Sequence, residues 1–166
     1  MTLLHDFTED EGHRFYQTLH EDILLKPNKW NEWDMQFQEG DVVNVTGHDS
    51  LHNAICIAIM TRYQELKHNP LYSDFGCRIH ELIKANKSEM VKYKIELFVQ
   101  DVLRNMRRVR KINWIEITEK YSEPYNYKVT WSVNSISDET IEGEVSIWHT
   151  NKDITKKYSL KHYKMH

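Results

Sequence analysis

Residues 88–118, SEMVKYKIELFVQDVLRNMRRVRKINWIEIT, decide the fold because their apolar periodicity changes part of the way along. Ser88 is a favoured helix N-cap residue, and Glu89 places an acid in the first turn. Apolar residues then recur at helical spacing, which predicts an amphipathic helix of roughly 18 residues. They are Val91, Ile95, Phe98, Val102 and Met106.

After Lys111 the apolar period falls from 3.6 to 2, which predicts strands. Alternation begins at Ile115 and Ile117 and returns in residues 127–133 and 141–147, with Tyr158 and Leu160 closing the set. Turn-forming residues separate these runs at 122–124, 137–139 and 151–153. Short connections between alternating strands favour an antiparallel meander with one solvent-exposed face.

Upstream of Ser88 the pattern predicts more helix than strand. Residues 8–23 have helical spacing, and residues 33–45 alternate around Glu39-Gly40, as in a hairpin. Residues 47–50 resemble a helix start with Asp49 or Ser50 as N-cap, followed by about four amphipathic turns. Asn69-Pro70 ends that segment, and a short helix is expected from Phe75.

Helices followed by strands predict an α+β fold, with helices packed on a small antiparallel sheet and a C-terminal β-meander. We expect three parts in one chain. Residues 1–32 form an acidic N-terminal arm with a short helix, residues 33–120 an α+β core, and residues 121–166 strands that extend the core. A chain of 166 residues can bury a core of its own.

Composition indicates a folded, soluble, intracellular protein, with 40% apolar and 28% charged residues and no visible secretory signal. No run reaches the roughly 18 apolar residues of a membrane span. The net charge is only −3, but residues 1–50 carry eleven acids against three bases, so the other residues net +5. This polarity suits docking between different neighbours, or an acidic arm lying on its own basic body.

Three patterns could carry chemistry. His48 and His52 are four apart and could share a metal, but an N-cap at Asp49 or Ser50 would leave His48 outside the helix. The C-terminal His162 and His166 could also chelate. We expect a solvated helix start and a frayed tail instead, and no cofactor.

A nucleophilic thiol is the second pattern. Cys56 is expected to pack as a small apolar residue, whereas Cys77, three residues before His80, is the better candidate thiol. The third pattern is a carboxylate pair for glycoside hydrolysis, for which Glu65, Asp74 and Glu81 lie around one predicted turn. With 25 acids in the chain, such proximity is expected by chance.

Five cations gather within eight residues at the predicted end of the long helix. We rank docking onto an acidic protein surface first, pairing with the negative helix terminus second, and nucleic-acid binding third, since the pI is only about 6.4. The cations are Arg104, Arg107, Arg108, Arg110 and Lys111.

The order of features in residues 47–117 resembles the lysozyme-like baseplate wedge family of contractile phage tails, whose members act as tail sheath initiators. A Gly-His-Asp helix start is followed by a Pro-aromatic-Gly turn and a long helix that leads through arginines into a strand. The turn residues are Pro70, Tyr72, Phe75 and Gly76. This chain departs from the family at the exit of the long helix. The family has Glu-Pro-Arg there and this chain has Met106-Arg107-Arg108, so only Arg108 carries over.

The resemblance implies a structural protein of the virion tail baseplate, made in the host cytoplasm, with relatives in type VI secretion and R-type pyocins. Its implied partners are the tail sheath protein, wedge proteins and tube or hub proteins, with six copies per baseplate and neither nucleic acid nor membrane. An incoming sheath strand would pair with an open sheet edge, which needs no catalytic residue. The alternative is a muramidase acting through the paired carboxylates.

Overall fold

Three antiparallel strands form the layer on which the helices lie, in a computed structural model that describes residues 21–27, 33–82, 85, 87–119 and 127–147. The strands are β7 (Val109–Glu119), β8 (Tyr127–Ser135) and β9 (Thr140–Ile147), in the order β7-β8-β9. The expected meander is therefore confirmed for these strands. Several predictions lie outside the described residues: residues 8–20 of the predicted helix, the turns at 122–124 and 151–153, the last strand, His162 and His166.

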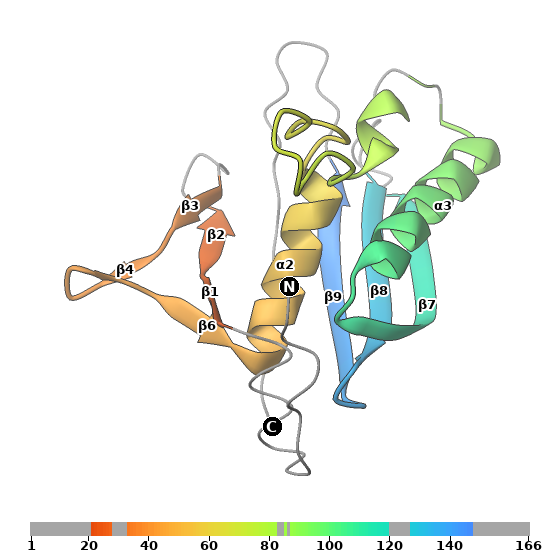
Figure 1. Ribbon diagram of the computed structural model, residues 1–166. Helices are drawn as coiled ribbons and strands as arrows, with labels where there is room; N and C mark the ends of the chain where they lie inside the picture. The colour runs from red at the N-terminus through yellow and green to blue at the C-terminus, as the bar shows by residue number, and fades with distance from the viewer. Residues whose placement is uncertain (1–20, 28–32, 83–84, 86, 120–126, 148–166) are drawn as a thin grey trace.

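Two helices cover one face of this sheet, α2 (Gly47–Met60) over β9 and α3 (Glu89–Asn105) over β7 (Figure 1). The Ser88 hydroxyl accepts a hydrogen bond from the Val91 amide at 3.2 Å, so the predicted N-cap of α3 is confirmed. No helix in the described part of the chain has the length and apolarity that a membrane crossing requires. The fold is α+β, as predicted.

The core lies between the helices and the inner face of the sheet. Trp131 and Val129 in β8 are fully buried, and they pair with Gly143 and Val145 in β9. Alternate residues of a strand point to opposite faces, so this register directs one apolar set toward the helices. The helices contribute buried side chains from their apolar sides: Leu51, Ile55 and Ile59 from α2, and Ile95, Val99 and Leu103 from α3.

The connection between the helices is a loop closed at its neck by backbone hydrogen bonds. The Cys77 amide donates to the Thr61 carbonyl at 2.8 Å, and the Tyr63 amide donates to the Cys77 carbonyl at 3.1 Å. Gly76 has φ +106°, and a Cβ there would lie 2.5 Å from the Arg62 carbonyl oxygen, so only glycine fits. The short helix expected from Phe75 is instead the 3-10 helix η1 (Arg78–Leu82), because this neck holds the preceding residues in an extended bridge.

Residues 21–27 and 33–46 build a three-armed β-module beside α2 (Figure 1). Its arms are three short antiparallel pairs: β1 (Glu21–Ile23) with β6 (Asn44–Thr46), β2 (Leu25–Pro27) with β3 (Trp33–Met35), and β4 (Phe37–Gln38) with β5 (Asp41–Val42). The predicted hairpin around Glu39-Gly40 is confirmed. The prediction of helix at residues 22–23 is wrong, because that backbone pairs with β6.

A closed ring of backbone hydrogen bonds joins the three arms. Leu24 donates to the Val43 carbonyl at 2.9 Å, Val43 to the Gln36 carbonyl at 2.8 Å, and Gln36 to the Leu24 carbonyl at 3.2 Å. Asn53 of α2, which is buried, fastens the module to the body. Its amide nitrogen donates to the Ile23 carbonyl at 3.1 Å, and its side-chain oxygen accepts from the Leu25 amide at 3.4 Å. The module therefore has a fixed root on α2.

Candidate functional site

The outer edge of β9 is the feature of the sheet best suited to accept another strand. Within the described residues, β9 pairs with β8 on one side and with no strand on the other. The Ser135 amide donates to the Glu139 carbonyl at 2.9 Å, which makes these residues a hydrogen-bonded pair in line with the β8–β9 register. Hydrogen-bonded and non-bonded pairs alternate along an antiparallel ladder. The backbone groups of Glu144 and Ser146 therefore point away from β8.

The opposite edge, on β7, is less regular. Its pairing with β8 shifts register twice, between Val109 and Lys111 and between Ile112 and Trp114. Bulges and charged residues are the usual means by which an edge strand is protected from pairing with other chains. The pairing of β9 with β8 runs without a register shift over its whole length. A straight edge on β9 and an interrupted one on β7 distinguish the two sides of the sheet.

The side chains of β9 fix its position on the sheet. Glu144 forms an ion pair with Lys128 across the β8–β9 ladder, and both side chains are partly shielded from solvent. On the inner face Gly143 lies against the Trp131 ring and His52 of α2, with no room for a side chain. The edge is therefore a rigid segment with a preset backbone geometry.

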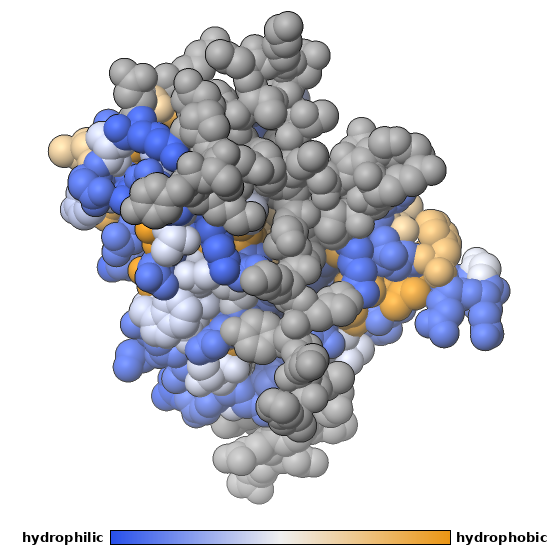
Figure 2. All heavy atoms as spheres, turned by 180° about the vertical axis from the view of Figure 1, so that it is seen from behind, coloured by the Kyte–Doolittle hydropathy of each residue, from blue (hydrophilic) through white to orange (hydrophobic). Residues whose placement is uncertain are grey.

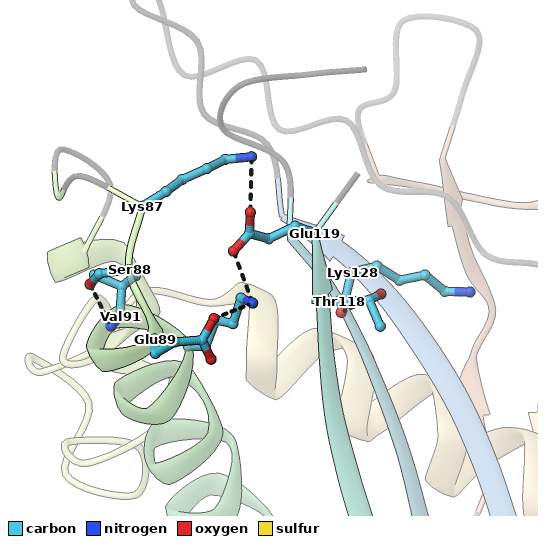
Figure 3. A network of polar contacts seen from close by, with 8 residues as sticks. Lys87, Ser88, Glu89, Val91, Thr118, Glu119 and Lys128 are labelled. Carbon is cyan, nitrogen blue, oxygen red and sulfur yellow. Dashed lines mark hydrogen bonds and ion pairs between the residues drawn. The ribbon is translucent and has the colours of Figure 1, made fainter. Parts of the chain in front are cut away.

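A polar network ties the start of α3 to the end of β7 (Figure 3). Glu119 lies 3.1 Å from the Lys92 ammonium and 3.5 Å from the Lys87 ammonium, and Lys92 also contacts Glu89 at 2.8 Å. The hydrogen bond from Lys92 lowers the pKa of Glu119 below its usual range. This network holds α3 on the sheet. Of its members, only Glu89 was indicated by the sequence pattern, as the acid in the first turn of the helix.

The five clustered cations are divided between different roles. Arg104 lies in the last turn of α3, which ends at Asn105, and the other four cations follow the end of the helix. Arg110 forms an ion pair with Asp138 in the turn between β8 and β9. Arg104, Arg107 and Lys111 are exposed, and the described residues give them no ion pair.

Arg108 is the partly buried member of the cluster. Its guanidinium donates to the Ser50 hydroxyl of α2 at 3.2 Å, and its carbonyl accepts from the Ile136 amide at 3.0 Å. Burial lowers the pKa of Arg108, and the Asp22 carboxylate of the module opposes that shift. Arg108 therefore links the α3–β7 turn, the first turn of α2 and the root of the module.

One of the two histidines of the candidate metal pattern, His48, does not lie where the sequence placed it. The N-cap of α2 is Thr46, so the expectation that His48 precedes the helix is wrong. Both histidines are on α2, but His48 forms an ion pair with Glu139, whereas His52 packs against Trp131 with ring centroids 5.5 Å apart. Among the described residues, no three His, Cys, Asp or Glu side chains form a cluster that could hold a metal ion.

The thiols are both buried. Burial raises the pKa of Cys56 to about 12 and that of Cys77 to about 12, so neither is a thiolate near neutral pH. Cys56 packs in the core, as expected. The choice of Cys77 as a candidate nucleophile is wrong, because the thiol is enclosed and the His80 ring donates instead to the Met60 carbonyl at 3.0 Å.

The three candidate carboxylates do not share a hydrogen-bond partner among the described residues. Glu65 accepts from the Arg62 amide at 3.0 Å, and Asp74 is exposed in the loop. Glu81 receives two hydrogen bonds from Arg78, at 2.8 and 3.0 Å, which lower its pKa. A general acid in glycoside hydrolysis needs a raised pKa, so Glu81 is tuned in the opposite direction.

The predicted turn residues occupy the loop between the helices. Pro70 is exposed, and the Tyr72 ring meets the Phe75 ring edge-on with centroids 5.9 Å apart. Phe75 is partly buried against the core beside Gly76. The sequence analysis missed Leu71, which is 85% exposed at the same loop. The sequence offered one indication of this exposure: Leu71 directly follows Pro70 in a loop without apolar periodicity.

Burial of His52 makes stability depend on pH. Burial lowers the pKa of His52, although the nearby Asp49 carboxylate raises it in part. The pKa of a histidine in the unfolded chain is about 6.5. As the pH falls below that value, the unfolded chain binds more protons than the folded chain, so the stability that the folded protein has at higher pH is lost.

We expect the free energy of unfolding to fall between pH 7 and pH 5.5, by less than about 1.4 kcal/mol per pH unit from this group. Urea unfolding of the wild type and of His52→Gln measures the difference between the two slopes. A wild-type slope equal to that of the variant would contradict the assignment.

No protein-family model matches the chain, and no curated protein matches it either.

Proposed function

We propose that the protein is a structural component of a contractile phage tail baseplate that initiates sheath assembly. The resemblance of residues 47–117 to the baseplate wedge family suggests this class of protein. The observation that carries the proposal is the regular outer edge of β9, which has no strand partner among the described residues. Such an edge is a ready template for another chain, and proteins usually protect it unless it has a partner to receive.

In this proposal a strand of the sheath protein pairs with β9 and extends the sheet to four strands. Main-chain hydrogen bonds provide the affinity, and the side chains on alternate positions provide the specificity. Two features support a passive, structural role for the edge. Lys128 and Glu144 brace the ladder, and the helices cover only the inner face, so the incoming strand meets a preset backbone.

The remaining surfaces would hold the protein on its neighbours in the baseplate. Arg104, Arg107 and Lys111 are exposed cations at the junction of α3 and β7, which fits docking to acidic surface on wedge, tube or hub proteins. Six copies around the tail would present six β9 edges and set the symmetry of the first sheath ring.

Co-expression with a sheath protein from the same source tests the proposal. We expect hexameric rings or short sheath stubs that contain both proteins, seen by negative-stain electron microscopy and absent when either protein is expressed alone. Sheath that assembles equally well without this chain would contradict an initiating role.

A further inference from the structure

The three-armed module exposes several large apolar side chains to solvent. Ile23, Met35, Phe37 and Val42 are 41%, 45%, 62% and 39% exposed, which is unusual for side chains of this size. Phe37 and Val42 are cross-strand partners, as are Leu25 and Met35, and residues two apart in a strand share a face. The two side chains of each of these pairs therefore lie on one face of their own arm. Figure 2 shows hydrophobic atoms over the module, bordered by hydrophilic atoms.

Acidic residues alternate with these apolar residues along the arms, so Asp34 and Asp41 point to the opposite face from Met35 and Val42. The described residues of the module carry five acids, Glu21, Asp22, Asp34, Glu39 and Asp41, against the single base Lys26. The two acids at the root are engaged: Glu21 accepts from Asn44 at 2.9 Å, and Asp22 accepts from Asn53 at 3.4 Å. Asp34, Glu39 and Asp41 lie on the arms that extend away from α2 (Figure 1). The outer arms thus combine exposed apolar surface with negative charge.

The opposite combination occurs at the junction of α3 and β7. Arg104, Arg107 and Lys111 are exposed there. Ile136, which is 37% exposed, is joined to the same turn by the hydrogen bond from its amide to the Arg108 carbonyl. We call these four residues the basic end. The basic end carries positive charge beside an exposed apolar side chain. Its charge is opposite to that of the outer arms, and its apolar side chain can pack against theirs.

The two surfaces of one molecule do not meet. Asn53 fixes the root of the module to α2, and α2 lies between the module and the α3–β7 layer (Figure 1). Asp22 already interacts with Arg108 at the root, while the outer acids are carried in another direction. Contact between the outer arms and the basic end therefore requires a second molecule.

We propose that the outer arms of one copy dock on the basic end of a second copy of this chain. Each copy then offers one acidic and one basic surface, so the contact is head-to-tail, and such contacts close into rings or continue as filaments. A ring fits the six copies of the proposed function, in which the acidic surface that receives the basic end is then the module of the neighbouring copy rather than a wedge, tube or hub protein. This self-association does not depend on the sheath.

Sedimentation and light scattering of the purified full chain test the proposal without any partner. At about 50 mM salt we expect association that grows with protein concentration, and at about 500 mM salt we expect monomers, because screening shortens the range of the charges. A chain that remains monomeric at low salt and high concentration overturns the proposal. Since no sheath is present, this result is independent of the ring and stub assay above.

Charge reversal identifies the two surfaces. The double variants Asp34→Lys with Asp41→Lys, and Arg107→Glu with Lys111→Glu, should each associate about tenfold or more weakly than the wild type. A mixture of the two double variants should recover association, because the reversed module of one matches the reversed basic end of the other. Glu96→Lys and Lys94→Glu make the same kinds of charge change on exposed positions of α3 and should leave association unchanged.

The outcomes of the reversal experiment are distinct. Circular dichroism and thermal unfolding first establish that each variant is folded like the wild type. Loss in both double variants with recovery in the mixture supports the proposal. Wild-type association in either double variant, or loss in the α3 controls to the same extent, overturns it, as does a mixture that stays monomeric.

Discussion

Replacing Gly143 by alanine is expected to destabilise the protein by about 3 kcal/mol, at the upper end of the usual cost of overpacking a core. A Cβ at this position would overlap the Trp131 indole, lying 2.7 Å from its Cε2 atom, and would lie 2.8 Å from His52 Nε2. Trp131 is fully buried, and the close packing of protein cores leaves such a ring little room to move. For a chain of this size the midpoint of thermal unfolding should fall by roughly 10 °C, measured by circular dichroism.

A second substitution separates the clash from a general effect at β9. Trp131→Phe removes the ring atoms that a Cβ at position 143 would meet, at its own cost in buried area. The Trp131→Phe substitution should therefore lower the free energy of unfolding clearly less in the Gly143→Ala variant than in the wild type. A double-mutant cycle measures this difference. Gly143→Ala with a melting temperature within 2 °C or so of the wild type would show that the indole does not lie against position 143.

Replacing Glu144 by proline should reduce ring and stub formation with the sheath protein about tenfold or more while the chain stays folded. The Glu144 N–H points away from β8, and proline is tolerated in an edge strand where the missing N–H faces outward. The lost backbone hydrogen bond and the bulk of the proline ring should together weaken the binding of the sheath strand by more than about 1.4 kcal/mol. We therefore expect the number of rings to fall by about tenfold or more. Counting particles by electron microscopy after co-expression gives the yield.

Glu144→Ala is the matched control. It also removes the ion pair with Lys128, but it retains the outward N–H, so its ring yield should stay close to that of the wild type. Equal losses in the two variants would attribute the effect to the ion pair. Normal ring formation by a folded Glu144→Pro chain would exclude β9 as the edge that receives the sheath.

The long helix and the meander could be predicted because their signals are local and repeated. In α3 the side chains of Val91, Ile95 and Val102 follow the helical period and are buried, and the Ser88 cap acts on the first turn. In β8 the alternating Val129, Trp131 and Val133 are fully buried. A periodic apolar pattern over many residues predicts the helix or strand without information on which element packs against its apolar face.

The three-armed module could not be predicted in this way. Its strands are two or three residues long, and the ring that joins Leu24, Gln36 and Val43 links positions up to 19 residues apart. Asp22 and Ile23 fit the phase of a preceding helix, so the local pattern favoured the wrong element. Long-range backbone hydrogen bonds and the contact with Asn53 determine the strand at these residues.

The start of α2 shows the same limit at a single position. Asp49 and Ser50 are good N-cap residues by type, yet the helix begins at Gly47 after Thr46. Ser50 is fully buried and bonded to Arg108, which lies 58 residues away in the chain. The Ser50 side chain, which the N-cap preference assigned to capping, therefore binds Arg108 in a tertiary contact instead.

By itself the sequence determined the α+β class, the α3 helix and the described strands of the meander, because periodic burial is encoded residue by residue. Only the tertiary structure decided which backbone groups of β9 face outward, how the clustered cations are divided, and where the acidic module stands. These features depend on register and on contacts between distant segments, which a linear pattern does not contain.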